Sequence, residues 1–176
     1  MDALTVAARA AATGDTEALD AFVRLSQPDV WRLCSFLVSP AEAEDLAQEV
    51  YERTLRSLAC YRGESAARTW LLAIARRVCA DHLRRRYRRE RRESQVVNDA
   101  ERTGCVSDAS GLIELQSLLG QLSTEQREAF VLTQVIGLTY QEAAEVCAVP
   151  IGTIRSRVAR AREALVLVVQ ADEAQA

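Results

Sequence analysis

Residues that break helices are scarce in this chain. Three prolines and seven glycines are spread over 176 residues, and runs that would indicate strands are nearly absent. Ala, Leu, Glu, Gln and Arg, which favour helices, dominate instead. Hydrophobic residues make up 49% of the chain and aromatic residues only 5%, which suits many short amphipathic helices. The chain is therefore predicted to be all-α.

A first helix is predicted over residues 40–58. Its start carries a capping-box pattern, with Ser39 as the cap, Pro40 in the first turn and Glu42 three residues after the cap. The inward side is expected to contain Leu46, Ala47, Val50, Leu55 and Leu58. The outward side carries an acidic line, which consists of Asp45, Gln48, Glu49 and Glu52. Because stacked carboxylates repel one another, this line is either a solvated surface or the binding site of a basic partner.

Arginines are concentrated further along the chain. The segment DHLRRRYRRERRE, residues 81–93, holds seven arginines against three acidic residues. This excess is larger than a helix C-terminus requires, and a phosphate backbone is the natural counter-charge. The whole chain has a net charge of only -3 and a pI of about 5.4, so it is not an indiscriminate nucleic-acid binder. The segregated charges predict one surface for nucleic acid and another for a basic protein.

Two further capping boxes mark the C-terminal helices. Ser123 and Gln126 begin a helix that is predicted to end at Gly137, and Thr139 and Glu142 begin a short one. The turn AVP then leads into the basic helix PIGTIRSRVARAREAL. The inward stripe of this helix consists of apolar residues: Ile151, Ile154, Val158, Ala161 and Leu165. The outward strip consists of Gly152, Ser156, Ala159 and Glu163. Four arginines flank that strip: Arg155, Arg157, Arg160 and Arg162. A short helix, a tight turn and a basic helix are typical of a helix-turn-helix.

The segment over residues 94–110 lacks apolar periodicity and is slightly acidic. It is predicted to be a linker between a domain over residues 1–93 and a second one over 111–170. No stretch approaches the roughly 18 apolar residues of a membrane span, and no signal peptide is visible, so we expect a cytoplasmic protein.

Cysteine and histidine usage argues against several kinds of site. The five cysteines are far apart without a CxxC pair, and His82 is the single histidine. This pattern encodes neither a zinc site nor a disulfide framework, so buried free thiols are expected and no metal or other cofactor is predicted.

Three segments, in this order, resemble the extracytoplasmic-function (ECF) sigma factors, compact sigma-70-type subunits of bacterial RNA polymerase. EDLAQEVYER resembles their core-polymerase-binding segment, RTWLLAIARRVCADHLRRR their minus-ten promoter helix, and LTYQEAAEVCAVPIGTIRSRVARAREAL their helix-turn-helix. The sequences TWLLAIAR and GTIRSRVARAR are similar to those of the actinobacterial sigma C type. The resemblance spans roughly residues 18–165 and implies core polymerase and promoter DNA as partners, with an anti-sigma factor as a further candidate; no homo-oligomer is expected.

The resemblance also implies roles for particular residues. The acidic line would bind the largest subunit of the polymerase core, in an assembly that includes the second-largest subunit. The loop over residues 61–68 would take a base flipped from the non-template strand, and the minus-ten contacts implied are Tyr61, Arg62, Arg68, Trp70, Arg76, Arg77, Arg84 and Arg85. For the minus-thirty-five element, Arg155, Ser156, Ala159 and Arg160 would face bases, Thr153, Arg157 and Arg162 would contact the backbone, and Tyr140 would lie nearby.

Two other functions fit parts of the sequence. A stand-alone helix-turn-helix regulator would explain residues 111–165 but would leave the acidic line and the RTWLLAIARR helix without a role. A metal-dependent nuclease could use Asp45, Glu49 and Glu52, although no second acidic helix supports it. On the resemblance, we expect a sigma factor and not an enzyme.

Overall fold

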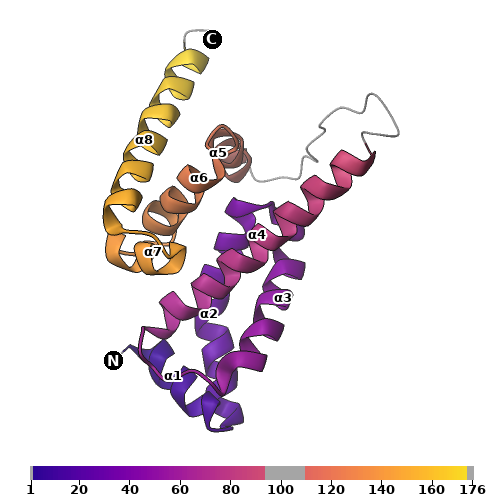
Figure 1. Cartoon of the computed structure of the whole chain (residues 1–176), viewed down its shortest axis with the longest axis vertical. Helices are drawn as coiled ribbons and strands as arrows, with labels where there is room; N and C mark the ends of the chain where they lie inside the picture. Colours follow the sequence, from indigo (N-terminus) through magenta and orange to yellow (C-terminus); the bar gives the residue numbers. More distant parts are fainter. Residues whose placement is uncertain (1, 94–109, 174–176) are drawn as a thin grey trace.

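The chain folds into helices, as the sequence predicts. The computed structural model describes residues 2–93 and 110–173. The N-terminal helices are α1 (Ala3–Ala12), α2 (Thr16–Leu37), α3 (Pro40–Leu58) and α4 (Ala67–Glu93). The C-terminal elements are α5 (Ser110–Gly120), α6 (Thr124–Phe130), the π-helical turn η1 (Val131–Val135), α7 (Tyr140–Cys147) and α8 (Ile151–Glu173) (Figure 1). No strand occurs in these described ranges, which confirms the all-α prediction. The predicted linker lies outside them, apart from Ser110, which begins α5.

Helices α1 to α4 pack into one bundle. Its core is formed by fully buried side chains that come from three of the helices: Phe22, Val30, Leu33, Val50, Leu71, Leu72 and Val78. Asp2 and Asp15 cap α1 and α2 with their carboxylates, which satisfies backbone donors that would otherwise lack a partner. No helix in the described ranges is both long and apolar enough to cross a bilayer.

Helix α3 has the predicted bounds but not the predicted cap. The hydroxyl of Ser39 donates to the Glu42 carboxylate at 2.8 Å and makes no bond to a backbone amide, so the capping box is absent. Glu42 is drawn away because His82 and Arg86 of α4 also bind it. The inward placement of Leu55 was wrong as well, since this side chain is 47% exposed.

Helices α5 to α8 form the second bundle. Both predicted capping boxes are present, at Ser123 with Gln126 and at Thr139 with Glu142. The predicted inward stripe of α8 is confirmed: Ile154, Val158 and Ala161 are buried, and Ile151 and Leu165 are partly buried. The sequence did not predict the π-helical turn η1, where the chain leaves regular α-geometry before Gly137.

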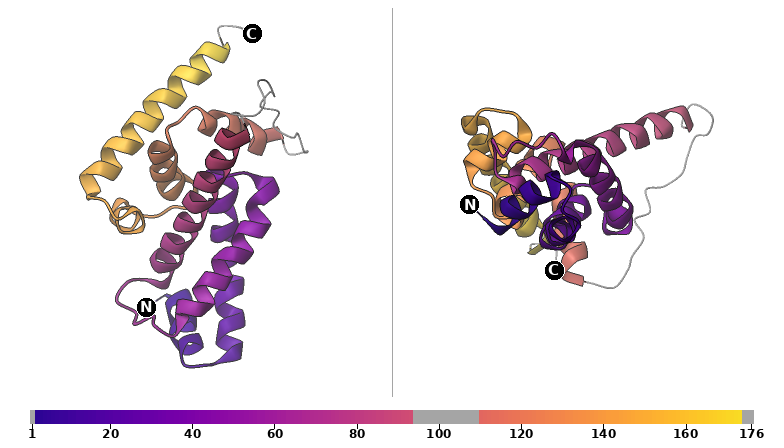
Figure 2. Two further views of the ribbon diagram at one scale, coloured as in Figure 1. Left: turned by 45° about the vertical axis from the view of Figure 1, so that its right-hand side comes forward. Right: turned by 90° about the horizontal axis from the view of Figure 1, so that it is seen from below.

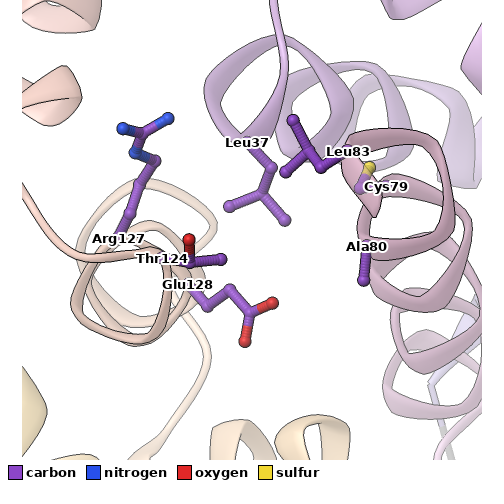
Figure 3. Close-up of a pocket in the computed structure, with 7 residues that line it drawn as sticks. All are labelled: Leu37, Cys79, Ala80, Leu83, Thr124, Arg127 and Glu128. Atoms are coloured by element: carbon purple, nitrogen blue, oxygen red, sulfur yellow. The ribbon is translucent and has the colours of Figure 1, made fainter. Parts of the chain in front are cut away.

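The two bundles touch each other. Helix α4 lies against α7, and α2 lies against η1 and α6 (Figures 1 and 2). Gln116 of α5 adds a hydrogen bond, at 2.7 Å, to the Ser35 carbonyl of α2. Between the bundles, Leu37, Cys79, Ala80 and Leu83 face Thr124, Arg127 and Glu128 around a cavity of about 20 Å³ (Figure 3). This cavity is about large enough for one water molecule. A larger open groove of about 1180 Å³ lies beside it and shares most of these residues.

Candidate nucleic-acid interface

The outward strip of α8 is open to solvent. Gly152, Ser156, Ala159 and Glu163 are all exposed. Three of the flanking arginines, Arg155, Arg160 and Arg162, are exposed too, while Arg157 is half-buried. Within the described residues, no ion pair engages these four side chains; the Arg162 guanidinium donates to the neutral Gln134 amide at 2.8 Å. Helix α8 therefore presents unpaired positive charge beside a small-residue surface, which suits the major groove of DNA.

A short turn fixes α8 relative to α7. Ala148 has φ 54° and ψ 46°, the left-handed conformation that ends many helices. The amides of Ala148 and Val149 bind carbonyls of the last turn of α7, so the turn is held by the backbone. Two residues assigned to the minus-thirty-five element, Tyr140 and Thr153, lie half-buried on either side of this turn, at the starts of α7 and α8.

The arginines near the start of α4 are bound by the C-terminal bundle. Arg76 Nε donates to Glu128 Oε2 of α6 at 2.8 Å, and the Glu128 side chain is only 5% exposed. Partial burial disfavours the Arg76 charge, but the attraction of Glu128 outweighs it and raises the Arg76 pKa. Arg68 donates both to Asp29 of α2 and to the Ile136 carbonyl after η1, each at 2.7 Å. Two residues assigned to minus-ten DNA thus have protein partners here, and neither partner was predicted.

Further along α4, arginines pair with α3. Glu49 binds Arg53 at 2.6 Å and Arg85 at 3.2 Å, and it is therefore directed toward α4 and not along the outer face of α3. The acidic line in the structure consists of the exposed residues Asp45, Gln48 and Glu52, and including Glu49 in one outer line was incorrect. Among the described residues, no three or more His, Cys, Asp or Glu side chains are grouped so that they could hold a metal ion, so Asp45, Glu49 and Glu52 do not form the metal site of the nuclease hypothesis.

Asp81 links this network to Arg84. Hydrogen bonds from Arg53 and Arg84, at 3.0 and 2.6 Å, lower the Asp81 pKa. Arg77 is exposed and has no ion pair within the described part of the chain. The second half of α4 therefore carries exposed arginines, two of which, Arg85 and Arg86, pair with carboxylates of the neighbouring α3.

The loop before α4 encloses a hollow of about 600 Å³. It is lined by Ala59, Cys60, Tyr61, Arg62, Glu64, Ser65 and Trp70. Arg62 is exposed and Trp70 half-buried, so both side chains are accessible to a ligand in the hollow. Tyr61, however, is 9% exposed, donates its hydroxyl to the Ser65 carbonyl at 2.7 Å and lies 4.9 Å from the Trp70 ring. Tyr61, an implied minus-ten contact, therefore forms a wall of the hollow and is largely covered by the protein.

The cysteines largely follow the sequence prediction. Cys34, Cys79 and Cys147 are buried thiols, and Cys60 is exposed at the hollow; Cys105 lies outside the described residues. The residues that sequence reasoning missed are those that depend on contacts across the fold. Glu128, Asp29 and Thr5 were not singled out, although a carboxylate or hydroxyl on an otherwise apolar helix face is a signal for a buried polar contact.

Comparisons with known proteins agree with this arrangement. Residues 22–89 match the family described as Sigma-70 region 2, and residues 112–165 match Sigma-70, region 4. The ECF RNA polymerase sigma factor SigC of Mycobacterium tuberculosis is 43% identical over 178 residues, covering 98% of this chain and 94% of that protein. The ECF RNA polymerase sigma-E factor of Escherichia coli is 32% identical, with 86% of each chain covered.

Solved structures give the same result for the fold. CnrH, in complex with the cytosolic domain of CnrY, superposes with a TM-score of 0.76 and 26% identity over 97% of this chain and 99% of that one. RpoE of Bartonella quintana, in complex with the anti-sigma factor NepR, has a TM-score of 0.74 and 29% identity over 89% of this chain and 99% of that one. The chain belongs to the ECF sigma factors of the sigma-70 family, the non-enzymatic subunits that direct RNA polymerase to promoters.

Proposed function

We propose that this sigma factor divides promoter recognition between its two bundles, acting with core polymerase in the cytoplasm. The exposed strip of α8, with Arg155, Ser156, Ala159 and Arg160, reads the minus-thirty-five element, while Arg157 and Arg162 contact phosphates. The hollow beside Trp70 receives an unstacked base of the minus-ten element, and the arginines of α4 contact the backbone around it. The observation that carries the proposal is the unpaired charge of the α8 arginines beside an exposed strip of small residues.

The acidic line supplies the core-binding contact in this proposal. Asp45, Gln48 and Glu52 are exposed, and neither Asp45 nor Glu52 forms an ion pair within the described residues, so a basic surface can reach them without disturbing the bundle. Glu49 contributes indirectly, because it neutralises Arg53 and Arg85 beside the line. RpoE of Bartonella quintana has been solved in complex with the anti-sigma factor NepR, and an anti-sigma factor that bound either bundle here would compete with these partners.

Charge reversal of the acidic line tests the core-binding role. In the double variant Asp45→Arg with Glu52→Arg, attraction to a basic surface becomes repulsion, so affinity for core polymerase should fall at least about tenfold. Glu49 is left intact because reversing it would also break the ion pairs with α4. The matched control is Glu17→Arg with Asp20→Arg, which reverses two exposed acids on α2.

Core retention and promoter-specific run-off transcription are the measurements. The control should behave as the unaltered protein, and the double variant should lose both activities while its melting temperature stays the same. Unchanged retention of core by the double variant would refute the role of the acidic line. Core binding without any promoter-specific start in the unaltered protein would refute the division of promoter recognition.

A further inference from the structure

Helix α1 lies outside the segment that matches Sigma-70 region 2, which begins at residue 22, yet it contacts the loop before α4 and the first residue of α4, next to the hollow. Thr5 of α1 is 6% exposed, and its hydroxyl accepts a hydrogen bond from the backbone amide of Ala67 at 3.0 Å in a buried position. Ala67 is the first residue of α4. The first amides of a helix have no partner within the helix, and the preceding residue, Ala66, has no side chain that could accept from them. Thr5 therefore caps α4 from another helix.

The Thr5 hydroxyl is itself held in place. It donates to Asp2 Oδ2 at 2.7 Å, and the Thr5 amide donates to Asp2 Oδ1 at 2.9 Å. The hydrogen bond from the Thr5 side chain lowers the Asp2 pKa, so Asp2 is an ionised acceptor at neutral pH. A continuous relay thus runs from the Ala67 amide through Thr5 to Asp2, and it fixes the hydroxyl orientation that the cap needs.

This cap lies next to the hollow, because α4 begins directly after the loop that lines it. Trp70 follows Ala67 by about one helical turn, and its ring packs on Tyr61. In the loop before α4, Gly63 has a φ of 75° and lies against the Arg9 side chain, since a Cβ at Gly63 would be 3.5 Å from Arg9 Cδ. Helix α1 therefore contacts the start of α4 through Thr5 and the loop before α4 through Arg9.

We propose that α1 is a positioning element for minus-ten recognition, in which Thr5 and Asp2 hold the start of α4 so that the hollow keeps the shape that accepts one unstacked base. This inference rests on the proposed minus-ten site. Thr5 does not touch DNA; it acts through Ala67 and the ring of Trp70. Replacement of Thr5 should therefore impair discrimination among bases more than overall affinity, which the arginines supply.

Three full-length variants, each assembled with core polymerase, test the proposal. Thr5→Val keeps the shape of the side chain and removes the hydroxyl, while Thr5→Ser keeps the hydroxyl. Thr54→Val is the matched control, because Thr54 is also fully buried in the same bundle and donates to its own helix, to the Val50 carbonyl at 2.7 Å. The probes are single-stranded oligonucleotides of the non-template minus-ten strand that carry each of the four bases at each position. The readout is the ratio of Kd values between the worst and the best base.

With the unaltered protein, one position should show a marked base preference. Thr5→Val should lower that ratio between about threefold and tenfold, because an unsatisfied Ala67 amide loosens the start of α4. Thr5→Ser should retain the ratio, and Thr54→Val should retain it despite a comparable fall in melting temperature. If Thr5→Val fails to fold, Asp2→Asn should lower the ratio in the same direction, because asparagine can still cap α1 through its amide oxygen but replaces the second carboxylate oxygen, which accepts from the Thr5 hydroxyl.

Equal ratios in Thr5→Val and Thr54→Val, with matching losses of melting temperature, would overturn the positioning role and leave Thr5 as a structural residue only. Absence of any base preference in the unaltered holoenzyme would overturn the proposed minus-ten pocket itself. The two failures are therefore distinguishable from each other.

Discussion

The arginines of α4 and those of α8 are similar in sequence but differ in what they contact. In α4, Arg68, Arg76, Arg84, Arg85 and Arg86 each pair with a carboxylate of the same chain. In α8, the described structure contains no such pair for Arg155, Arg157, Arg160 or Arg162. The α8 arginines are therefore available to DNA, whereas these five α4 arginines must exchange internal partners for phosphates; Arg77 of α4 is exposed and has no ion pair within the described residues. An arginine-rich segment does not by itself tell whether its charge is available.

The largest expected effect is the difference in alkylation rate between two thiols, Cys60 and Cys147. Cys147 reports on the contact between the bundles because it lies in α7, which packs against α4. Burial raises the pKa of Cys147 to about 11, so at pH 8 only about one thiol in a thousand is ionised. With iodoacetamide at pH 8, the exposed Cys60 should react at least about a hundredfold faster than Cys147. The Cys147 rate should rise with pH toward 11. Peptide mass spectrometry over time measures both rates; equal rates would show that α7 does not pack closely on α4.

In α8, alanine substitutions of Arg160 and Arg162 should have different effects on promoter binding. Loss of a bidentate contact to guanine costs about 1–3 kcal/mol of discrimination between bases. Arg160→Ala should therefore reduce the affinity ratio between the best and the worst minus-thirty-five variants by about tenfold to a hundredfold. Arg162→Ala should weaken all variants alike and reduce the salt slope by about one unit, because one fewer phosphate is contacted. Holoenzyme binding to a promoter panel at several salt concentrations measures both. If both variants preserve the ranking, bases are read elsewhere.

On the α4 side, release of Arg76 should strengthen DNA binding. Glu128→Gln removes the charge that holds Arg76, so the free protein should bind minus-ten single strands about threefold to tenfold more tightly, while minus-thirty-five duplex binding stays constant. Glu125→Gln, at an exposed position of the same helix, is the control. Fluorescence anisotropy with both probes measures the effect. No gain in single-strand affinity would mean that Glu128 does not compete with DNA for Arg76.

The smallest effect is expected at the turn that orients α8. Ala148 adopts a left-handed conformation that costs about 1 kcal/mol for a residue with a side chain. Glycine relieves that cost but increases the freedom of the unfolded chain, so Ala148→Gly should stabilise the protein by about 0.5 kcal/mol without changing promoter ranking. Thermal unfolding measures the gain, and a lower melting temperature would show that the Ala148 methyl group makes stabilising contacts.

Local features of the sequence predicted the local features of the fold. The boxes at Ser123 and Thr139 formed because each involves partners three residues apart. The capping box predicted at Ser39 did not form, because residues distant in the sequence, His82 and Arg86 of α4, bind its Glu42 carboxylate. Helical periodicity was sufficient to predict the buried face of α8, because this face packs within its own bundle.

The same distinction applies to the functional surfaces. The positions in α8 could be assigned from one helix and its spacing. The direction of Glu49, the burial of Tyr61 and the pairing of Arg76 with Glu128 could not, because each depends on a second helix whose placement the periodicity does not specify. The family resemblance implied ligands for these residues but not their partners in the free chain.

The distance between the two bundles tests the central claim most directly. Fluorescent labels at Gln27→Cys of α2 and Glu145→Cys of α7, both exposed positions, with Cys60 and Cys105 replaced by serine, report that distance by energy transfer. Elements about 25 base pairs apart lie about 85 Å apart on B-form DNA, at about 3.4 Å per base pair. The account predicts high transfer in the free protein, where α4 and α7 touch, and a large loss of transfer in the promoter-bound holoenzyme. Equally high transfer in the promoter complex would contradict it, because Arg68 and Arg76 would then have kept their internal partners while the promoter was bound.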